Sequence, residues 1–514
     1  MSRALGNLRS TPDQFFEGPR SLRVLDLSRT SIQRLPSSSS SLPNLRELSL
    51  QRCPRLEKQG SLPPCLLTQL ESLHLSRSTI SELPSGIGEL VNLRRLDLSF
   101  NPSLEFLPQN VISKLTRLEE FKMVLSFTDW RAPGTRRSHK TIASLDEVAS
   151  LRQLSCLCLD MVDTGPTFQK DEHWEKLERF CFRIDRLEHD AHVFEYMRNH
   201  QRIIIIDGHK PIAQWAKALF SWMTFLQLYY RKGLKALSRL YTDTTAEVSF
   251  RCLEYLEIYK FPEMEYILEE KDAEGVMLEN LQHLELHYLQ LQIAHDEHCL
   301  PQIAFQHLSY VKVVECGQLK HVFPSSLWQR MRYLNLSNLE VYTCSKMEYV
   351  LTTASTSGSG STQDIALPKI ESVHPEGLPK LRSIWMGTAL PLQSVRRLSL
   401  VKCNGLNVVL SATPAKGLPN PAELQVRDCN GVEVIVSRED GMEDTAVLPN
   451  LTFLELERVC EEAQQWHLLE EIAVKECPNL MKLPLNAQMM PSLRWTKGEE
   501  HWWEGLKRSS QHAI

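Results

Sequence analysis

The chain has 514 residues, of which 42% are hydrophobic and 24% are charged, and its net charge is −5. This balance excludes the strongly basic composition of a dedicated nucleic-acid binder. Its 13 cysteines favour free thiols in a reducing compartment over a disulfide scaffold. The sequence shows no signal-peptide core and no apolar run near the ~20 residues that span a bilayer, so we expect a cytoplasmic protein without a membrane span.

A fixed spacing of leucines recurs in the first part of the chain. Leu22, Leu25 and Leu27 follow the pattern Leu-x-x-Leu-x-Leu. The pattern starts again at Leu45, Leu70 and Leu93, after 23, 25 and 23 residues. Alternating leucines predict a short strand with one buried face, and units that bury leucines only against their neighbours must stack. The period is typical of leucine-rich repeats. We therefore expect an α/β repeat solenoid, a horseshoe with a parallel concave β-sheet and an irregular convex side.

The repeats of the first half are of two kinds. Residues 1–126 hold regular repeats that end in Leu-Pro steps, as at Leu83-Pro84, where proline fixes φ and removes a backbone donor. In residues 127–250 the leucine pattern degrades, and residues 129–139 form a basic, turn-rich insert. We expect that insert to be a surface loop.

The second half carries repeats with a different ending. Irregular repeats fill residues 251–494, and they end in short apolar pairs such as Val350-Leu351 in place of Leu-Pro. Within them, residues 352–363 form a Ser/Thr/Gly tract that predicts a flexible loop between repeats. Residues 495–514 form a C-terminal tail that contains Trp502 and Trp503.

Cysteines recur at one position of the repeat. Asn101 occupies this position in the fourth repeat, and in such repeats its side chain turns inward and ties the loop backbone. Six of the cysteines stand there: Cys53, Cys316, Cys344, Cys403, Cys429 and Cys477. Cysteine is small and frequently buried, which favours a structural role. No paired Cys-x2-Cys spacing indicates a zinc site, so we expect no metal ligand.

Signals for catalysis are weak. Cys158-Leu159-Asp160 resembles a short element of one bacterial ubiquitin-ligase family, but Cys158 lies between two leucines of a repeat strand and no separate helical domain follows. The chain contains no Gly-x4-Gly-Lys-Ser/Thr loop and no Gly-x-Gly-x-x-Gly motif. We therefore expect no enzyme activity, no catalytic residue and no cofactor-binding residue in this chain.

The exposed positions of the repeat strands are the candidate binding residues. Residues 1–120 carry a net charge of +3, and the remainder carries −8. The last exposed strand position holds Arg29, Arg52, Arg77 and Phe100 in the first four repeats. Because stacked strands lie ~4.8 Å apart, these arginines should form a ladder. The central exposed position later holds Glu257, Glu285, Glu340 and Glu455. A face that runs from basic to acidic would orient a protein partner, while ordinary solvated surface is the competing interpretation.

The order of these blocks resembles a known family, the coiled-coil, nucleotide-binding, leucine-rich-repeat immune receptors of plants. The first block is residues 15–36, with Phe15-Phe16 and the first leucine repeat. Residues 316–323 and 344–351 are similar to the irregular C-terminal repeats of that family, and residues 498–506 are similar to its tail. The resemblance covers essentially the whole chain but only the repeat portion of the family.

The resemblance implies a function in plant defence. It implies recognition of a pathogen effector or a guarded host protein, and an autoinhibitory contact with a nucleotide-binding switch domain that this chain does not contain. ADP or ATP is expected only on that domain, and no nucleic acid is expected as a partner. A fragment, a truncated gene model and a genuine short paralogue all remain open. The alternative is a general leucine-rich-repeat adaptor or the substrate-binding arm of a ubiquitin ligase.

Overall fold

The computed structural model describes most repeat strands and their turns. The described residues are 20–35, 42–56, 67–130, 136–137, 140–161, 174–185, 193–208, 212, 214–230, 233–237, 240, 250–264, 267, 278–291, 305–322, 336–352, 370–386, 394–412, 421–432, 434–438, 450–457, 471–475 and 494–497. The fold is a parallel β-solenoid, as the leucine spacing predicts. It divides into two compact units, residues 1–229 (unit 1) and 230–514 (unit 2). The division falls within the segment 127–250, where the leucine pattern degrades.

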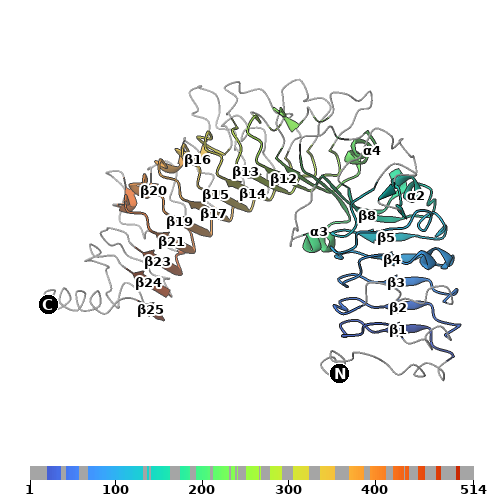
Figure 1. The fold of residues 1–514 in the computed structure, drawn as a ribbon. Coiled ribbons are helices and arrows are strands. Elements are labelled where there is room, and N and C mark those ends of the chain that lie inside the picture. The colour runs from blue at the N-terminus through green and yellow to red at the C-terminus, as the bar shows by residue number, and fades with distance from the viewer. Residues whose placement is uncertain are drawn as a thin grey trace. The chain divides into compact units, whose positions relative to one another are not determined.

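Unit 1 is a stack of parallel strands joined one repeat at a time (Figure 1). Its strands are β1 (Val24–Asp26), β2 (Glu47–Ser49), β3 (Ser72–His74), β4 (Arg95–Asp97), β5 (Glu120–Met123), β8 (Cys156–Met161), β9 (Arg179–Ile184), β10 (Arg202–Ile206) and β11 (Phe225–Tyr229). The pairing register places Leu25, Leu48, Leu73 and Leu96 side by side, and all four are buried. The predicted leucine grid is therefore the core of this unit.

The return segments of unit 1 contain short helices. They are η3 (Ser85–Glu89), α2 (Leu145–Ala149), η4 (Trp174–Lys176), α3 (Val193–Asn199), α4 (Gln214–Ala218) and η5 (Leu219–Ser221). In the predicted basic insert, β6 (Arg136–Arg137) pairs as an antiparallel hairpin with β7 (Lys140–Thr141), which directly follows the insert. In Figure 1, α2 and α3 lie on opposite sides of unit 1.

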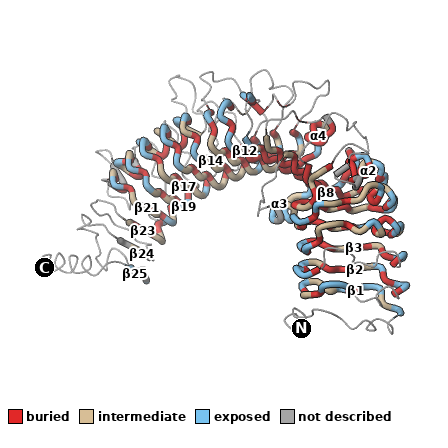
Figure 2. The backbone as a smooth tube through the Cα atoms, viewed as in Figure 1, coloured by how far each residue is buried: buried red, intermediate tan, exposed pale blue. Residues whose placement is uncertain are grey.

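Unit 2 repeats the same parallel plan, mostly with strands of five residues. They are β12 (Tyr255–Tyr259), β13 (His283–His287), β14 (Tyr310–Val314), β15 (Asn338–Tyr342), β17 (Ser372–Glu376), β19 (Arg397–Val401), β21 (Glu423–Arg427), β23 (Phe453–Glu457), β24 (Glu471–Lys475) and β25 (Trp495–Lys497). Buried and half-buried residues alternate along β13, β14, β15 and β17 (Figure 2). One face of these strands is therefore core, and the other is the concave surface.

The two kinds of repeat ending fold differently. After Leu83-Pro84 in unit 1 the chain enters the 3-10 turn η3. In unit 2 the endings form additional parallel strand pairs, in which β16 (Tyr349–Thr352) pairs with β18 (Ser383–Met386), and β20 (Val408–Ala412) pairs with β22 (Val434–Arg438). The physical reason is that proline removes a ladder donor, whereas a pair such as Val350-Leu351 suits a strand.

The inward-facing Asn and Cys position is as expected. The Asn101 side-chain amide donates to the carbonyl oxygens of Leu98 at 2.7 Å and Leu75 at 3.0 Å. The Cys53 thiol donates to Leu27 O at 3.3 Å, and the Cys316 thiol donates to Leu286 O at 3.6 Å. Five of the six predicted cysteines are fully buried: Cys53, Cys316, Cys344, Cys403 and Cys429. These side chains tie each turn to the preceding repeat.

Some predictions fall on parts of the chain that the structure does not describe. Cys477, Trp502 and Trp503 lie outside the described residues, and so does the predicted loop 352–363 apart from Thr352. Among the helices that are described, none has both the length and the apolarity needed to cross a membrane.

Candidate functional site

The three arginines of the predicted ladder lie in the turns that follow the strands. The pattern placed them at the last strand position, but β1 ends at Asp26 and β2 at Ser49, three residues before Arg29 and Arg52. Arg29, Arg52 and Arg77 have φ angles of 62°, 56° and 58°. A left-handed residue cannot continue a strand, which explains the shift from strand to turn.

These turns stack in register. The backbone N–H of Arg29 donates to Gln51 O at 2.8 Å, that of Arg52 to Ser76 O at 2.9 Å, and that of Arg77 to Ser99 O at 3.0 Å. Each turn is therefore bonded to the next repeat in the same way. The Arg77 guanidinium lies over the ring of Phe100, 4.5 Å from its centroid, and Phe100 occupies the same left-handed position with φ 60°. We call Arg29, Arg52 and Arg77 the arginine ladder.

A hollow of about 410 Å³ lies along the arginine ladder. It is lined by Ser28, Arg29, Gln51, Arg52, Ser76, Arg77, Asp97, Ser99, Phe100, Lys122, Met197 and Arg198. The last two residues belong to α3, so this helix faces the ladder across the hollow. Four arginines and one lysine therefore surround a space that a single aspartate also lines.

The acidic groups near the ladder are engaged with the backbone. Asp26 accepts the Ser28 backbone N–H at 2.9 Å, and Asp97 accepts the Ser99 N–H at 3.0 Å. The hydrogen bonds from Ser28 hold the pKa of Asp26 below its ordinary value, and the charges of His74 and Arg29 contribute in the same direction. Asp26 is thus held as an anion, and both carboxylates accept hydrogen bonds within their own turns.

The predicted glutamates lie at the centre of strands of unit 2, on the concave side. Glu257 of β12 and Glu285 of β13 are paired in register, followed by Lys312 of β14 and Glu340 of β15. Glu455 lies apart from them on β23, where it accepts a hydrogen bond from Arg427 Nη2 at 2.7 Å. Three of the four predicted glutamates therefore lie on neighbouring strands, interrupted by a lysine. Glu257 is buried, however, and not exposed as the pattern predicted.

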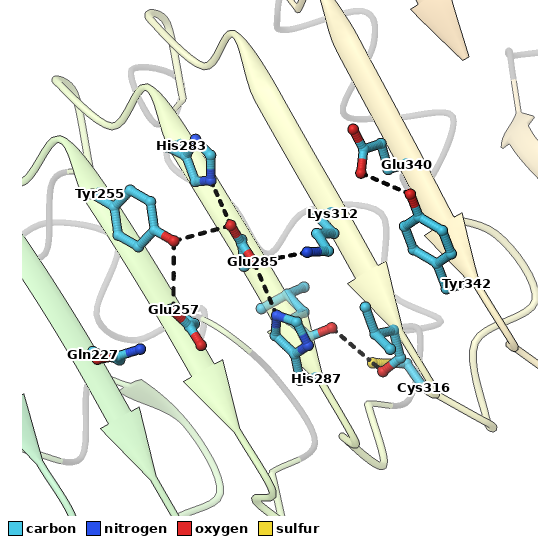
Figure 3. A network of polar contacts seen from close by, with 12 residues as sticks. Gln227, Tyr255, Glu257, His283, Glu285, His287, Lys312, Cys316, Glu340 and Tyr342 are labelled. Carbon is cyan, nitrogen blue, oxygen red and sulfur yellow. Dashed lines mark hydrogen bonds and ion pairs between the residues drawn. The ribbon is translucent and has the colours of Figure 1, made fainter. Parts of the chain in front are cut away.

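Glu285 is the centre of a polar network (Figure 3). Its carboxylate contacts His283 Nε2 at 2.7 Å, Tyr255 Oη at 2.9 Å, His287 Nε2 at 3.0 Å and Lys312 Nζ at 3.5 Å. Burial alone would raise the pKa of Glu285, but the hydrogen bonds from the two histidines, helped by the charge of Lys312, hold that pKa well below its usual range. Glu285 is therefore a fixed anion.

Aromatic and histidine rings stack beside this carboxylate column. The rings of Tyr255 and His283 lie 4.3 Å apart at 16°, and those of His283 and Tyr310 lie 4.1 Å apart at 14°. Tyr342 donates to Glu340 at 3.0 Å. Sequence reasoning missed these rings, although Tyr255, His283 and Tyr310 each stand two residues before a central strand position. We call this region, comprising Tyr255, Glu257, His283, Glu285, His287, Tyr310, Lys312, Glu340 and Tyr342, the acidic-aromatic face.

The corresponding face of the later strands of unit 1 is buried. Asp160 of β8 and Arg183 of β9 are paired in register, and their side chains form a buried ion pair at 2.5 Å. Burial raises the pKa of Asp160 to about 6, against the opposing charge of Arg183. Cys158 is buried beside them, and its hydrogen bond to Cys156 together with burial raises its pKa well above the usual value. A buried, protonated thiol is the opposite of an activated nucleophile.

No group of three or more His, Cys, Asp or Glu side chains within the described part of the chain is arranged to hold a metal ion. The surfaces that the structure builds are instead the arginine ladder with its hollow and the acidic-aromatic face. Both are suited to noncovalent binding.

Comparison with known families and proteins agrees with this architecture. Residues 287–430 match the leucine-rich repeats of plant disease resistance proteins of the RPS2-like type, and residues 5–54 match a general leucine-rich repeat family. A solved leucine-rich-repeat protein from Leptospira interrogans aligns with 95% of this chain and 98% of its own, with a TM-score of 0.50 and 17% identity. That likeness supports the solenoid fold alone.

Two curated relatives come from Arabidopsis thaliana. A probable disease resistance protein is 31% identical over 407 residues, which cover 78% of this chain and 42% of the relative. A disease resistance protein is 23% identical over 520 residues, covering 99% of this chain and 43% of the relative. The chain thus spans about two fifths of the length of each. With the family match and the solenoid, these relatives show that the chain carries leucine-rich repeats of the type found in plant disease resistance proteins.

Proposed function

We propose that this chain is the sensing region of a plant immune receptor that acts in the cytoplasm. Its acidic-aromatic face recognises a pathogen effector or a guarded host protein, and its arginine ladder contacts a nucleotide-binding switch domain that carries the ADP or ATP. The relatives are disease resistance proteins, and the two surfaces of opposite charge support two separate protein contacts.

The observation that carries this proposal is the arginine ladder. Its three guanidinium groups are exposed, they recur once per repeat, and hydrogen-bonded turns hold their backbones. Nearby Asp26 and Asp97 are occupied by backbone N–H groups. Such an ordered row of charges is suited to an acidic protein surface, because complementary potentials set orientation and exclude wrong partners.

Binding of the full chain to the purified switch domain of a receptor of this family tests the ladder. We expect the triple variant Arg29→Glu/Arg52→Glu/Arg77→Glu to lose at least tenfold in affinity, since rim charge reversals act on both encounter and complementarity. Arg55→Glu is the matched control, because Arg55 is exposed in the same unit and does not line the hollow. Unchanged binding by the triple variant, with an unchanged circular dichroism spectrum, would refute the ladder contact.

The acidic-aromatic face is tested by recognition in plant tissue. We expect Glu340→Lys to abolish the cell-death response to the matching effector while binding to the switch domain stays intact. Glu423→Lys on β21 is the control, since Glu423 is exposed and stands on another part of the concave surface. A retained cell-death response in Glu340→Lys would show that the acidic-aromatic face does not recognise the effector.

A further inference from the structure

The hollow beside the arginine ladder has the dimensions of a small-molecule site. Its volume of about 410 Å³ lies in the ~300–1,000 Å³ range of ligand pockets. The ladder turns form one wall and α3 forms another, through Met197 and Arg198. A protein domain could contact the ladder without touching this second wall. The second wall therefore favours a smaller ligand that fits between the ladder and α3.

The chemistry of the lining selects an anion. Arginine presents a planar fork of donors that matches the paired oxygens of a phosphate. Arg29 and Arg52 are both exposed toward solvent, and Lys122 adds a further charge from β5. Ser28 and Gln51 also line the hollow, so polar residues stand beside the cations.

The one acid of the lining does not cancel this preference. Asp97 is one carboxylate among four arginines and one lysine. Lys122 is held by Glu120 at 3.0 Å, but Glu120 itself does not line the hollow. The hollow is therefore lined by more cations than anions, and this positive balance favours a ligand that carries more than one negative charge.

We infer that this hollow binds a small molecule that carries two or more phosphate groups. Consecutive ladder arginines lie one strand spacing apart, about 4.8 Å, so neighbouring phosphates are contacted by neighbouring repeats. Arg198 of α3 reaches the same ligand from the opposite wall. This site goes beyond the proposed function and does not depend on the switch-domain contact, because it follows from the hollow and its lining alone.

Isothermal titration of the full chain with tripolyphosphate tests the inference. We expect saturable binding with a 1:1 stoichiometry that weakens as salt rises, because exposed charges are screened. Orthophosphate should bind at least tenfold more weakly. Citrate supplies several negative charges without phosphate, and it should also bind at least tenfold more weakly.

Single substitutions locate the site. Arg52→Gln should lose about tenfold in affinity, the equivalent of one charge-assisted hydrogen bond. Arg52→Lys should lose less, because it keeps the charge but not the fork. Arg55→Gln, outside the hollow, should bind as the unsubstituted chain does.

Three results with the small anions and the variants would overturn the inference. They are the absence of tripolyphosphate binding by the folded chain, equal losses in Arg52→Gln and Arg55→Gln, and equal affinity for citrate. A glutamate-rich peptide that binds more tightly than tripolyphosphate would also overturn it, in favour of an acidic protein segment. Because the switch-domain assay is separate, failure here leaves the ladder contact standing, and failure there leaves this site standing.

Discussion

Units 1 and 2 build the same solenoid with different polar groups on and behind their strands. In unit 1, Asn101 ties the turns with full amide hydrogen bonds, and the carboxylate of Asp160 is buried with Arg183. In unit 2, Cys316 makes weak thiol hydrogen bonds, and the carboxylate of Glu285 lies among four donors on the concave face. The repeat thus fixes the spacing of the apolar residues in both units, whereas different side chains supply the polar contacts in each unit.

The largest expected change in unfolding free energy concerns the buried ion pair of unit 1, Asp160 and Arg183. Arg183→Met would leave the carboxyl group of Asp160 buried without its cation, and breaking a buried ion pair costs about 3–5 kcal/mol. We expect that loss in the unfolding free energy reported by hydrogen exchange of β8 and β9 in increasing urea. Exchange in β21 and β23 of unit 2 should not change.

The double variant separates charge from packing. Asp160→Asn together with Arg183→Met removes the uncompensated charge but keeps an oxygen that accepts the Leu125 backbone N–H. It should therefore be more stable than Arg183→Met alone. If the double variant were the less stable of the two, the cost would lie in lost packing, and the ion pair would not be the cause.

The next largest effect on stability compares asparagine and cysteine at the inward-facing position of the repeat. Asn101 donates to Leu98 and Leu75 and accepts the Ser78 N–H at 2.8 Å. Asn101→Ala orphans these buried groups and should cost about 2–3 kcal/mol. Cys316→Ala loses a weaker donor and should cost about 1 kcal/mol. Local hydrogen exchange measures both, and equal costs would mean that the position is held by packing alone.

The two carboxylates predict opposite responses to acid. The pKa of Glu285 is lowered on folding, so its contribution is complete above its unfolded value near 4.5 and is lost as the pH falls below that value. The pKa of Asp160 is raised to about 6, so the folded state binds a proton first and unit 1 gains stability as the pH falls from 6 toward 4.

Matched variants isolate the pH-dependent contributions of Glu285 and Asp160 to stability. The difference in stability between the unsubstituted chain and Glu285→Gln should shrink on acidification to below pH 4, by about 1.5 kcal/mol as for one hydrogen bond to a charged group. The difference between the unsubstituted chain and Asp160→Asn should move in the opposite direction between pH 6 and pH 4. Urea titrations followed by hydrogen exchange across this range measure both, and parallel responses would contradict the assigned environments.

The sequence predicted the features that follow from the repeat period, and it missed the contacts between side chains on neighbouring strands. Leucine spacing located β1 to β4, and the position shared by Asn101 and Cys53 predicted a buried side chain. The stacked rings of Tyr255 and His283 could not be found this way, because their contact runs between strands 28 residues apart. The burial of Asp160 was hidden for the same reason, since a concave position is open or covered according to how other segments pack.

The smallest effect concerns the left-handed turn that carries the ladder. Lys402 occupies this turn in unit 2 with φ 53°, and Gly377 occupies it in the preceding repeat with φ 67°. Lys402→Gly relieves about as much strain as it adds in unfolded-state entropy, so stability should change by less than about 0.5 kcal/mol. Lys402→Val should cost about 1–2 kcal/mol, because a β-branched side chain fits this conformation poorly.

This pair of variants tests whether folding of the turn alone explains the arginines of the ladder. If glycine is tolerated at Lys402 and valine is not, the turn selects only for backbone freedom and is indifferent to charge. Three successive arginines at Arg29, Arg52 and Arg77 are then not explained by folding, since glycine or asparagine would serve the turn as well. A loss of 1 kcal/mol or more in Lys402→Gly would instead mean that the long side chain itself stabilises the turn, and the ladder would need no ligand to explain it.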